Sequence, residues 1–403
     1  MDRSFFSNFR HDDYQRDNFD AFIKAIRFSF GVKSIHITGS NGKTSVANYL
    51  AGAYKANNYK VGLFTSPCLY QINEMIRING EPISDDDFMS IFNKYKKEIS
   101  KFDLSPFEIE TFVALSYFQN SGCDIAIIEC GMGGEIDATN IITPILSIIT
   151  SISLEHTEFL GYTISEITSQ KAGIIKENVP VLISDMPEDA MTVIYENAKF
   201  NNSKICYLGH YVHDEFSLSG YSFEYGEFGK IELSSLAKYS IDNCVMALES
   251  LTILKDQLPY DVELVRKGLK EVFLPTQVEV INQSPLVIVD GAHNQEGMKK
   301  LCDVSLLKLI GERPIHVLFA CSKDKNLSAM LAVIGETTND LTITTYDSPR
   351  ARGEEEYFLF AEDYPFVADA KQLLLDKMNE FPEDCILISG SMEFASYMRQ
   401  VLK

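Results

Sequence analysis

The sequence contains no tryptophan, few basic residues and no long apolar run. Its 403 residues include 36 Lys and Arg against 57 Asp and Glu, which gives a formal net charge of −21. A nucleic-acid binder is expected to present a basic face, and anionic membranes repel an acidic protein. No segment approaches the roughly 18 consecutive apolar residues of a transmembrane helix, and Met1–His11 lacks the apolar core of a signal peptide. We therefore expect no nucleic-acid partner, no membrane partner and a cytoplasmic location.

The eight cysteines form no C-x-x-C pair and show no zinc-type spacing. Several lie inside apolar runs, as reduced core cysteines do, which favours a reducing compartment. A chain of this length can bury a large core without disulfides. At roughly 150 residues per domain, it is long enough for two or three domains.

The apolar runs are short, rich in β-branched residues and separated by segments of helical length. Because these runs are continuous rather than alternating, they predict strands buried on both faces, hence a parallel sheet covered by helices. The predicted strands are Ser34–Thr38, Lys60–Phe64, Asp124–Glu129, Leu146–Thr150 and Val179–Ser184. The helices expected between them include Lys43–Ala56, Asp85–Glu98 and Phe107–Gln119.

A second series of strands and helices follows residue 284. Its predicted strands are Leu286–Val289, Ile315–Phe319, Leu341–Thr345 and Cys385–Ile388. The sequence therefore predicts an α/β protein with a larger domain over residues 1–284 and a smaller one over 285–403. Between them in the chain, Leu218–Leu233 alternates polar and aromatic residues around two glycines, which indicates a small antiparallel insertion.

The sharpest motif lies between a predicted strand and a predicted helix, and it reads Thr38-Gly39-Ser40-Asn41-Gly42-Lys43-Thr44-Ser45. Glycines let the backbone approach phosphates, and a helix N-terminus directs N–H groups and positive charge toward them. Lys43 can supply charge at the β- and γ-phosphates, and Thr44 or Ser45 can support Mg²⁺. The standard phosphate-loop spacing would place glycine at Ile37, so this motif is a shortened variant. The alternative is an Asn-Gly turn before an ordinary helix.

Other polar residues follow predicted strands, where α/β folds place their ligand sites. Glu129 ends a buried strand and is a candidate magnesium ligand; the alternative is a solvated strand end. His156 follows the strand Leu146–Thr150, although a lone histidine is more often structural. Lys171 lies on a predicted helix, where most lysines are simply solvated. Asp290-Gly291-Ala292-His293-Asn294 directly follows the first strand of the second series.

The order of these motifs resembles the folylpolyglutamate synthase and dihydrofolate synthase branch of the Mur ligase superfamily. The resemblance runs from about residue 33 to the C-terminus. It rests on Thr38–Ser45, Thr65-Ser66-Pro67, Phe107-Glu108, Glu129 through Asn140, Glu155-His156-Thr157, Leu160-Gly161, Lys171-Ala172-Gly173 and Asp290–Asn294. It implies an N-terminal P-loop ATPase domain with a mainly parallel sheet and a smaller Rossmann-like C-terminal domain. It also implies ATP-dependent amide formation, in which a pterin or folate carboxylate becomes an acyl phosphate that the amino group of L-glutamate attacks.

The resemblance further implies roles for individual residues. Magnesium ligands would be Ser66, Glu129 and His156, with Lys171 carbamylated to bridge a second metal. ATP contacts would come from Gly39, Ser40, Asn41, Gly42, Lys43, Thr44, Ser45, Asn243, Asp290 and His293. The pterin substrate would contact Ser105, Pro106, Phe107, Ile136, Asp137 and Ala138. The catalytic residues would be Lys43, Glu129, His156 and Lys171. The implied cofactors are ATP and Mg²⁺ at two sites, with K⁺ as a further candidate, and the implied oligomeric state is a monomer.

Several positions depart from the family pattern. Cys68 replaces a common histidine, and Tyr239 stands in Ala237-Lys238-Tyr239-Ser240 where the family has Gly-x-His-Gln. Gln277, in Pro275-Thr276-Gln277-Val278-Glu279, replaces a phosphate-facing arginine, for which Arg350 or Arg352 are candidate substitutes. Ser105-Pro106 replaces the more usual Thr-aromatic pair. These departures leave three alternatives open: the same ligation chemistry on another acid, a catalytically weak paralogue that acts as a binding protein, and a generic P-loop ATPase or GTPase switch.

Overall fold

The computed structural model describes residues 1–7, 9, 16–338, 340–358 and 363–402. The chain forms two compact units, which are described separately below. The first unit comprises residues 1–212, 224–231 and 242–272, and the second comprises residues 213–223, 232–241 and 273–403. The predicted division after residue 284 stays a prediction about domain organisation.

The first unit is built on an eight-stranded sheet in the order β4-β3-β2-β5-β1-β6-β7-β8. Its strands β2, β5, β1, β6, β7 and β8 are parallel, whereas β3 and β4 add an antiparallel edge. The strands are β1 (Ser34–Thr38), β2 (Val61–Phe64), β3 (Ile76–Ile78), β4 (Glu81–Pro82), β5 (Ile125–Glu129), β6 (Leu146–Ile149), β7 (Val181–Ile183) and β8 (Ile205–Tyr207).

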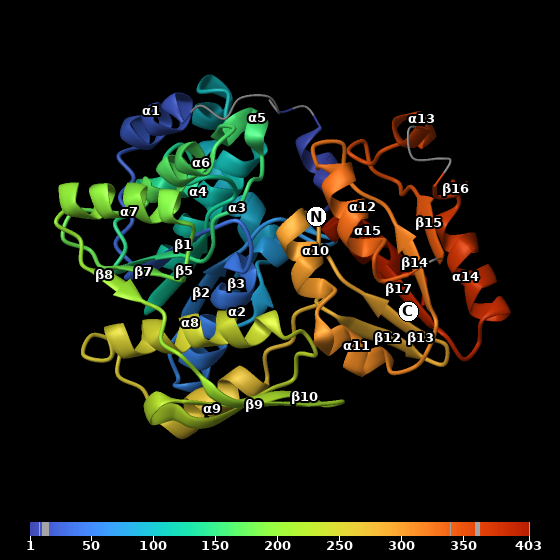
Figure 1. Ribbon diagram of the computed structural model, residues 1–403. Coiled ribbons are helices and arrows are strands. Elements are labelled where there is room, and N and C mark those ends of the chain that lie inside the picture. The colour runs from blue at the N-terminus through green and yellow to red at the C-terminus, as the bar shows by residue number, and fades with distance from the viewer. Residues whose placement is uncertain (8, 10–15, 339, 359–362, 403) are drawn as a thin grey trace. The chain divides into compact units, whose positions relative to one another are not determined.

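Helices lie on both faces of this sheet (Figure 1). They are α1 (Asp17–Ile26), α2 (Lys43–Ala56), α3 (Asp85–Lys101), α4 (Pro106–Asn120), α5 (Thr157–Leu160), α6 (Ile164–Ala172), α7 (Glu188–Phe200) and α9 (Val262–Lys270), with the 3₁₀ helices η1 (Arg3–Phe6), η2 (Ile72–Met75), η3 (Ala138–Ile141) and η4 (Gly226–Phe228). Helix α8 (Tyr239–Leu254) begins with residues that group with the second unit and continues in the first. Among the described helices, none combines the length and apolar character that a membrane-spanning segment needs.

The second unit contains a six-stranded sheet in the order β12-β13-β17-β14-β15-β16. Only β12 runs antiparallel to its neighbour. The strands are β12 (Glu279–Gln283), β13 (Leu286–Val289), β14 (Ile315–Phe319), β15 (Asp340–Thr344), β16 (Phe366–Val367) and β17 (Cys385–Ser389). The helices are α10 (Gln295–Leu301), α11 (Val304–Ile310), α12 (Leu327–Ile334), α13 (Glu354–Tyr357), α14 (Ala370–Glu380) and α15 (Met392–Arg399).

The predicted insertion is a separate three-stranded sheet in the order β11-β10-β9. Its strands are β9 (Val212–Ser217), β10 (Gly220–Tyr225) and β11 (Gly229–Leu233). The continuous apolar runs correctly predicted the buried strands of both larger sheets, and β1 and α2 have the expected bounds. Val179–Ser184 shortens to β7, since Pro180 lacks the N–H that a ladder position requires. The strands β3, β4, β8, β12 and β16 were not predicted, because they are short or only partly buried.

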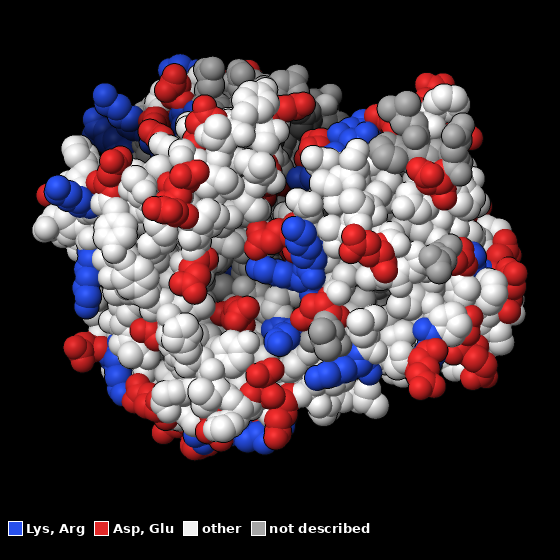
Figure 2. Space-filling view, in the orientation of Figure 1, with Lys and Arg blue, Asp and Glu red and all other residues white. Residues whose placement is uncertain are grey.

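Acidic side chains are scattered over the face shown in Figure 2, as the net charge of −21 leads one to expect. The apolar core of the first unit includes the phenylalanines of α1, α3 and α4. No disulfide joins any of the eight cysteines, all of which lie within the described residues. The folded units therefore rest on buried apolar surface, as expected for chains of this size.

Candidate functional site

The glycine-rich segment connects β1 to α2, as a phosphate loop does. Gly39 and Gly42 adopt φ values of 145° and 90°, which side chains rarely tolerate. A Cβ on Gly39 would lie 1.9 Å from Oγ1 of Thr150, so the loop is pressed against the end of β6. The Asn41 N–H donates to Oγ of Ser151 at 2.9 Å, and no side chain caps α2. The loop therefore leaves backbone N–H groups at the N-terminus of α2 available to bind an anion.

Two side chains that open α2 complete this loop. Lys43 Nζ donates to the carbonyl oxygens of Gly39 at 2.7 Å and of Ser40 at 3.4 Å, so its charge lies over the loop. Thr44 Oγ1 donates to Oε1 and Oε2 of Glu129 at 2.9 and 3.0 Å. The loop and the end of β5 therefore meet directly. Asn243 also belongs here, because a Cβ on Gly42 would lie 2.4 Å from its Oδ1.

Glu129 is a buried carboxylate among positive charges. Burial raises its pKa to about 7, although Lys43, the Thr44 hydroxyl, the Ser66 N–H and Arg77 all act in the opposite direction. Arg77 on β3 was not predicted to have a role; its Nη2 donates to Oγ1 of Thr65 at 3.1 Å. A buried carboxylate whose anionic form is costly is a group that gains from a bound cation.

Lys171 on α6 is almost fully buried, and its Nζ donates to Oε1 of Glu155 at 2.8 Å. Burial lowers the pKa of Lys171, and Glu155 opposes this effect. Burial also disfavours the Glu155 anion, but Lys171, Lys43 and His156 together lower the pKa of Glu155 to about 2. The structure therefore brings Lys43, Glu155, His156 and Lys171 into one electrostatic cluster. The sequence analysis named Glu155 only as part of the motif Glu155-His156-Thr157 and predicted no role for it, although its position beside His156 could have suggested one.

His156 precedes α5 and has a left-handed backbone, with φ of 45°. Among residues other than glycine, this conformation is uncommon, although histidine adopts it more readily than most, together with asparagine and aspartate. The side chain is half-buried, and His156 is close enough to Glu155 to favour its anion. Its predicted role as a metal ligand stays a proposal.

The predicted substrate residues lie on α4 and on the segment that follows β5. Ser105 and Pro106 begin α4, where the Ser105 side chain caps the helix together with Glu108. Phe107 is packed against the second segment, since a Cβ on Gly131 would lie 2.5 Å from its ring. Asp137 is buried there and accepts the N–H groups of Met132 and Thr139, each at 2.9 Å. Ile136 is half-buried and Ala138 is buried.

In the second unit, Asp290 follows β13 and is buried. Its Oδ2 accepts the Tyr239 hydroxyl at 2.9 Å and the Val278 N–H at 2.9 Å, while Oδ1 accepts the Ala292 N–H at 2.8 Å. Burial raises its pKa to about 6, although these three donors lower it. His293 Nδ1 lies 2.9 Å from the Gly291 carbonyl oxygen. Thus Asp290 organises the loops around it.

The loop that departs most from the family pattern keeps an unusual backbone. On either side of Gln277, Thr276 has φ of 61° and Val278 has φ of 47°. Glu279 fixes this loop by accepting the Thr276 N–H at 2.9 Å and Nε of Arg399 at 2.7 Å. Thr276 and Val278 therefore adopt the left-handed conformation without being glycine, which costs free energy for residues with a β-branched side chain.

The two candidate substitutes for the lost arginine differ in their surroundings. Arg352 donates to the carbonyl oxygens of Lys323 and Lys325 at 2.8 Å each, so its guanidinium ties that loop together. Arg350 is half-exposed and pairs with Asp324 at 3.4 Å and with Glu393 at 3.7 Å. Of the two, Arg350 is the one whose charge remains accessible to solvent.

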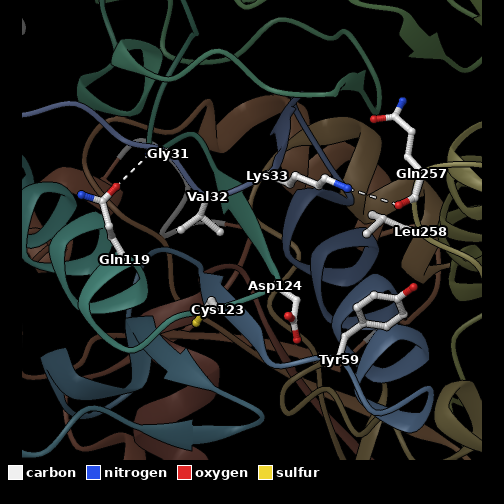
Figure 3. Close-up of a pocket in the computed structure, with 9 residues that line it drawn as sticks. All are labelled: Gly31, Val32, Lys33, Tyr59, Gln119, Cys123, Asp124, Gln257 and Leu258. Atoms are coloured by element: carbon white, nitrogen blue, oxygen red, sulfur yellow. Dashed lines mark hydrogen bonds between the residues drawn. The ribbon is translucent and has the colours of Figure 1, made fainter.

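A cavity of about 610 Å³ lies at the opposite ends of the same strands, where β1, β2 and β5 begin (Figure 3). It is lined by Gly31, Val32, Lys33, Tyr59, Gln119, Cys123, Asp124, Gln257 and Leu258. Lys33 donates to the Gln257 carbonyl oxygen at 3.3 Å, and Gln119 accepts the Gly31 N–H at 2.8 Å. Since ligand sites of open α/β sheets lie at the carboxyl ends of strands, this cavity is not a candidate for the main site.

The predicted magnesium site offers oxygen-bearing groups suited to a hard cation. Glu129 supplies a buried carboxylate with an elevated pKa, and the Thr44 hydroxyl and Ser66 lie against it. Burial also favours the neutral amine of Lys171, the form that reacts with carbon dioxide. No three His, Cys, Asp or Glu side chains of the described residues gather closely enough to hold a metal by themselves. A Mg²⁺ ion bound beside Glu129 would therefore need further ligands, such as phosphate or a modified lysine.

Comparisons with known proteins agree with this architecture. Residues 37–251 match the Mur ligase middle domain, and residues 278–392 match the Mur ligase glutamate ligase domain. The chain is 31% identical to folylpolyglutamate synthase of Lacticaseibacillus casei over 91% of its own length and 89% of that protein. It is 30% identical to dihydrofolate synthase/folylpolyglutamate synthase of Bacillus subtilis, over 92% and 91% of the two chains.

A solved structure of Mycobacterium tuberculosis folylpolyglutamate synthase, complexed with ADP and AMPPCP, superimposes with a TM-score of 0.88 at 26% identity. The match covers 96% of this chain and 95% of that one. Both the family resemblance and the predicted α/β fold are confirmed. The chain therefore belongs to the Mur ligase family, in the group of folylpolyglutamate and dihydrofolate synthases.

Proposed function

We propose that this protein is an ATP-dependent ligase that joins L-glutamate to the carboxylate of a pterin or folate acceptor. The acceptor would be dihydropteroate, a reduced folate polyglutamate, or both. The observation that carries the proposal is the arrangement of Lys43, Glu129 and Lys171. A phosphate loop, a buried carboxylate in contact with it and a buried lysine lie in one electrostatic cluster, within a chain of this family.

The chemistry proceeds in two steps. The acceptor carboxylate attacks the γ-phosphorus of ATP, so a new P–O bond forms as the bond to ADP breaks. The amine of glutamate then attacks the acyl phosphate carbonyl; the C–N bond forms, phosphate leaves, and the amine gives up its proton to solvent. The first step is needed because a free carboxylate is a poor electrophile until its oxygen becomes part of a good leaving group.

The residues of the chain act mainly by positioning charge before the reaction. The N–H groups of the loop and Lys43 bind the phosphates and stabilise the charge that develops on them. Thr44 holds the Glu129 carboxylate in place through one hydroxyl proton that both carboxylate oxygens share. We assign Asn243, Asp290 and His293 to the nucleotide, and Phe107, Ile136 and Ala138 to the acceptor, with Ser105, Pro106 and Asp137 shaping the acceptor segments.

Ser66, Glu129 and His156 would hold one Mg²⁺, and a carbamylated Lys171 would contribute to a second. When bound, Mg²⁺ neutralises phosphate charge and makes the phosphorus easier to attack. Glu155 pairs with unmodified Lys171 and stabilises it inside the protein. K⁺ remains a further candidate cofactor. We also propose that the enzyme works as a monomer in the cytoplasm, a location that eight cysteines without a disulfide support.

Two departures favour a second candidate function, the same ligation chemistry on another acid or a weak catalyst that acts as a binding protein. Gln277 lacks the charge of the arginine found at this position in the family. Tyr239 replaces a histidine, and its hydroxyl donates a hydrogen bond to Oδ2 of Asp290. Against the binding-protein candidate, the phosphate loop, Glu129, His156 and Lys171 are all retained.

The deciding experiment measures ADP release by the purified protein with ATP, Mg²⁺, bicarbonate and L-glutamate. Parallel reactions contain dihydropteroate, tetrahydrofolate or neither, and mass spectrometry identifies the products. Product with dihydropteroate alone identifies a dihydrofolate synthase, and product with both identifies a bifunctional enzyme. ATP binding without product from either acceptor contradicts the proposal and favours another acid or a binding protein.

A further inference from the structure

The central strand β1 carries polar residues on one buried face. Side chains alternate along a strand, so Ser34, His36 and Thr38 share a face while Ile35 and Ile37 share the other. All five are buried. Burying the polar nitrogens of an imidazole costs free energy that burying an isoleucine does not. Burial also lowers the pKa of His36 to about 3, which favours the neutral ring. This face therefore needs an explanation other than packing.

The polar face contacts the segment 130–139, which follows β5. His36 Nε2 lies 2.8 Å from Thr139 Oγ1 and 3.1 Å from Cys130 Sγ. Thr38 Oγ1 donates to the carbonyl oxygen of Gly133. The strand that leads into the phosphate loop thus holds the predicted acceptor segment at two points.

The hydrogen bonds have a defined direction. Thr139 Oγ1 has two acceptors for its one proton, Oδ1 of Asp137 and Sγ of Cys130 at 3.5 Å, and we assign the proton to the carboxylate as the stronger acceptor. The threonine oxygen then accepts from His36, which assigns the imidazole proton to Nε2. Nδ1 then carries only a lone pair, consistent with its having no hydrogen-bond partner within the described residues. The neutral histidine donates to threonine, which donates to aspartate.

Asp137 is the last residue in this series of hydrogen bonds. All the acceptor positions of its carboxylate are occupied by donors from residues 131–139. Its carboxylate accepts the Thr139 hydroxyl and the N–H groups of Thr139, Met132 and Gly131. Four donors match the roughly four acceptor positions of a carboxylate. Asp137 therefore fixes the shape of its segment, and any contact with a ligand falls to its neighbours. The Phe107 ring packs against the same segment at Gly131.

We propose that His36 and Thr139 are positioning residues, which act through Asp137 to hold residues 131–138 in the conformation that receives the pterin end of the acceptor. This inference rests on the proposed function for the identity of the acceptor. Buried hydrogen bonds between a strand and a loop can favour one loop conformation where apolar packing would allow several, and here they do so although Nδ1 of His36 lacks a partner among the described residues. The network should therefore affect binding of the acceptor and leave binding of the nucleotide unchanged.

The test compares two pairs of variants. Thr139→Val keeps the shape of the side chain but removes the hydroxyl, whereas Thr139→Ser keeps the hydroxyl. His36→Leu removes the donor, whereas His36→Gln places an amide N–H near the position of Nε2. We expect Thr139→Val and His36→Leu to raise the KM for the acceptor at least tenfold and to leave the KM for ATP within twofold. Thr139→Ser and His36→Gln should stay within threefold of wild type for both.

Hydrogen exchange provides a readout that does not require turnover. Amides of residues 131–139 should exchange at least tenfold faster in Thr139→Val, while those of α2 keep their protection. An unchanged acceptor KM together with unchanged exchange would overturn the inference, as would equal increases in both KM values. If the wild-type protein ligates neither acceptor, the proposed function fails, and the exchange rates still decide whether this network holds the segment. If Thr139→Val does not fold, the same measurements on His36→Leu, with His36→Gln as its control, decide whether the inference holds.

Discussion

The hydroxyl of Tyr239 donates a 2.9 Å hydrogen bond to Oδ2 of Asp290, in place of the histidine expected at this position in the family. Both residues belong to the second unit, and the bond joins the start of α8 to the loop after β13. Asp290 is buried, and the tyrosine is one of three donors that favour its charged form. The replacement of histidine thus leaves Asp290 with a hydrogen-bond donor.

We expect Tyr239→Phe to destabilise the protein in a pH-dependent manner. Burial raises the folded-state pKa of Asp290 to about 6, above its ordinary value of 3.8, so its contribution to stability falls as pH rises through this window. Removing a donor to the anion raises that pKa further. The free energy of unfolding should therefore fall by about 1–2 kcal/mol at pH 8 and by less than half as much at pH 4.5.

Urea denaturation at the two pH values measures this difference. Tyr162→Phe is a matched control, since Tyr162 is 75% exposed. An equal loss of stability at both pH values would show that the Tyr239 hydroxyl does not act on the Asp290 charge.

We expect Lys171→Arg to fold and to lose at least 100-fold in turnover. The guanidinium can still pair with Glu155, but it cannot be carbamylated. Lys171→Ala is the weaker test, because it leaves Glu155 buried without its ion-pair partner, which typically costs about 3–5 kcal/mol. Steady-state kinetics with and without added bicarbonate, together with thermal unfolding, separates the two effects. Near-wild-type turnover in Lys171→Arg would remove the carbamylated-lysine assignment.

We expect Gln277→Arg to raise kcat/KM for ATP about tenfold or more, since it restores a charged contact to phosphate. Gln277→Ala provides the control for a change at this position without added charge. If the arginine has no effect, another cation already fills the role, and Arg350→Gln should then raise the KM for ATP. Arg350 is the residue to replace, because Arg352 donates to two backbone carbonyl oxygens and its loss would also disturb that loop.

We expect Thr44→Val to destabilise the metal-free protein by about 1–3 kcal/mol, because it removes the hydroxyl that donates to both oxygens of buried Glu129. Thr44→Ser should recover most of this loss. Chemical denaturation in the presence of a chelator measures the difference. Equal stability of the valine and serine variants would mean that the hydroxyl does not support Glu129.

Local patterns were enough to place the strands and helices that carry most predicted site residues. The run Ser34–Thr38 and the glycines after it predicted β1 and α2 with their observed bounds, because apolar continuity and glycine punctuation are short-range signals. Glu129 was singled out because it ends a buried strand, and His156 and Asp290 because they follow strands. The antiparallel strands β3 and β4 were not predicted, since two or three residues are too few to show the alternation of a strand.

The sequence by itself determined the family, the order of the chemical motifs and the elements that carry them. Only the tertiary structure decided which polar groups meet: Lys171 with Glu155, Tyr239 with Asp290, and His36 with Thr139. His36 and Thr139 lie 103 positions apart in the chain. Periodicity reports how a segment faces its surroundings, but it carries no information about which distant side chain completes a hydrogen bond. Those partners exist only once parallel strands have brought their ends and following loops together.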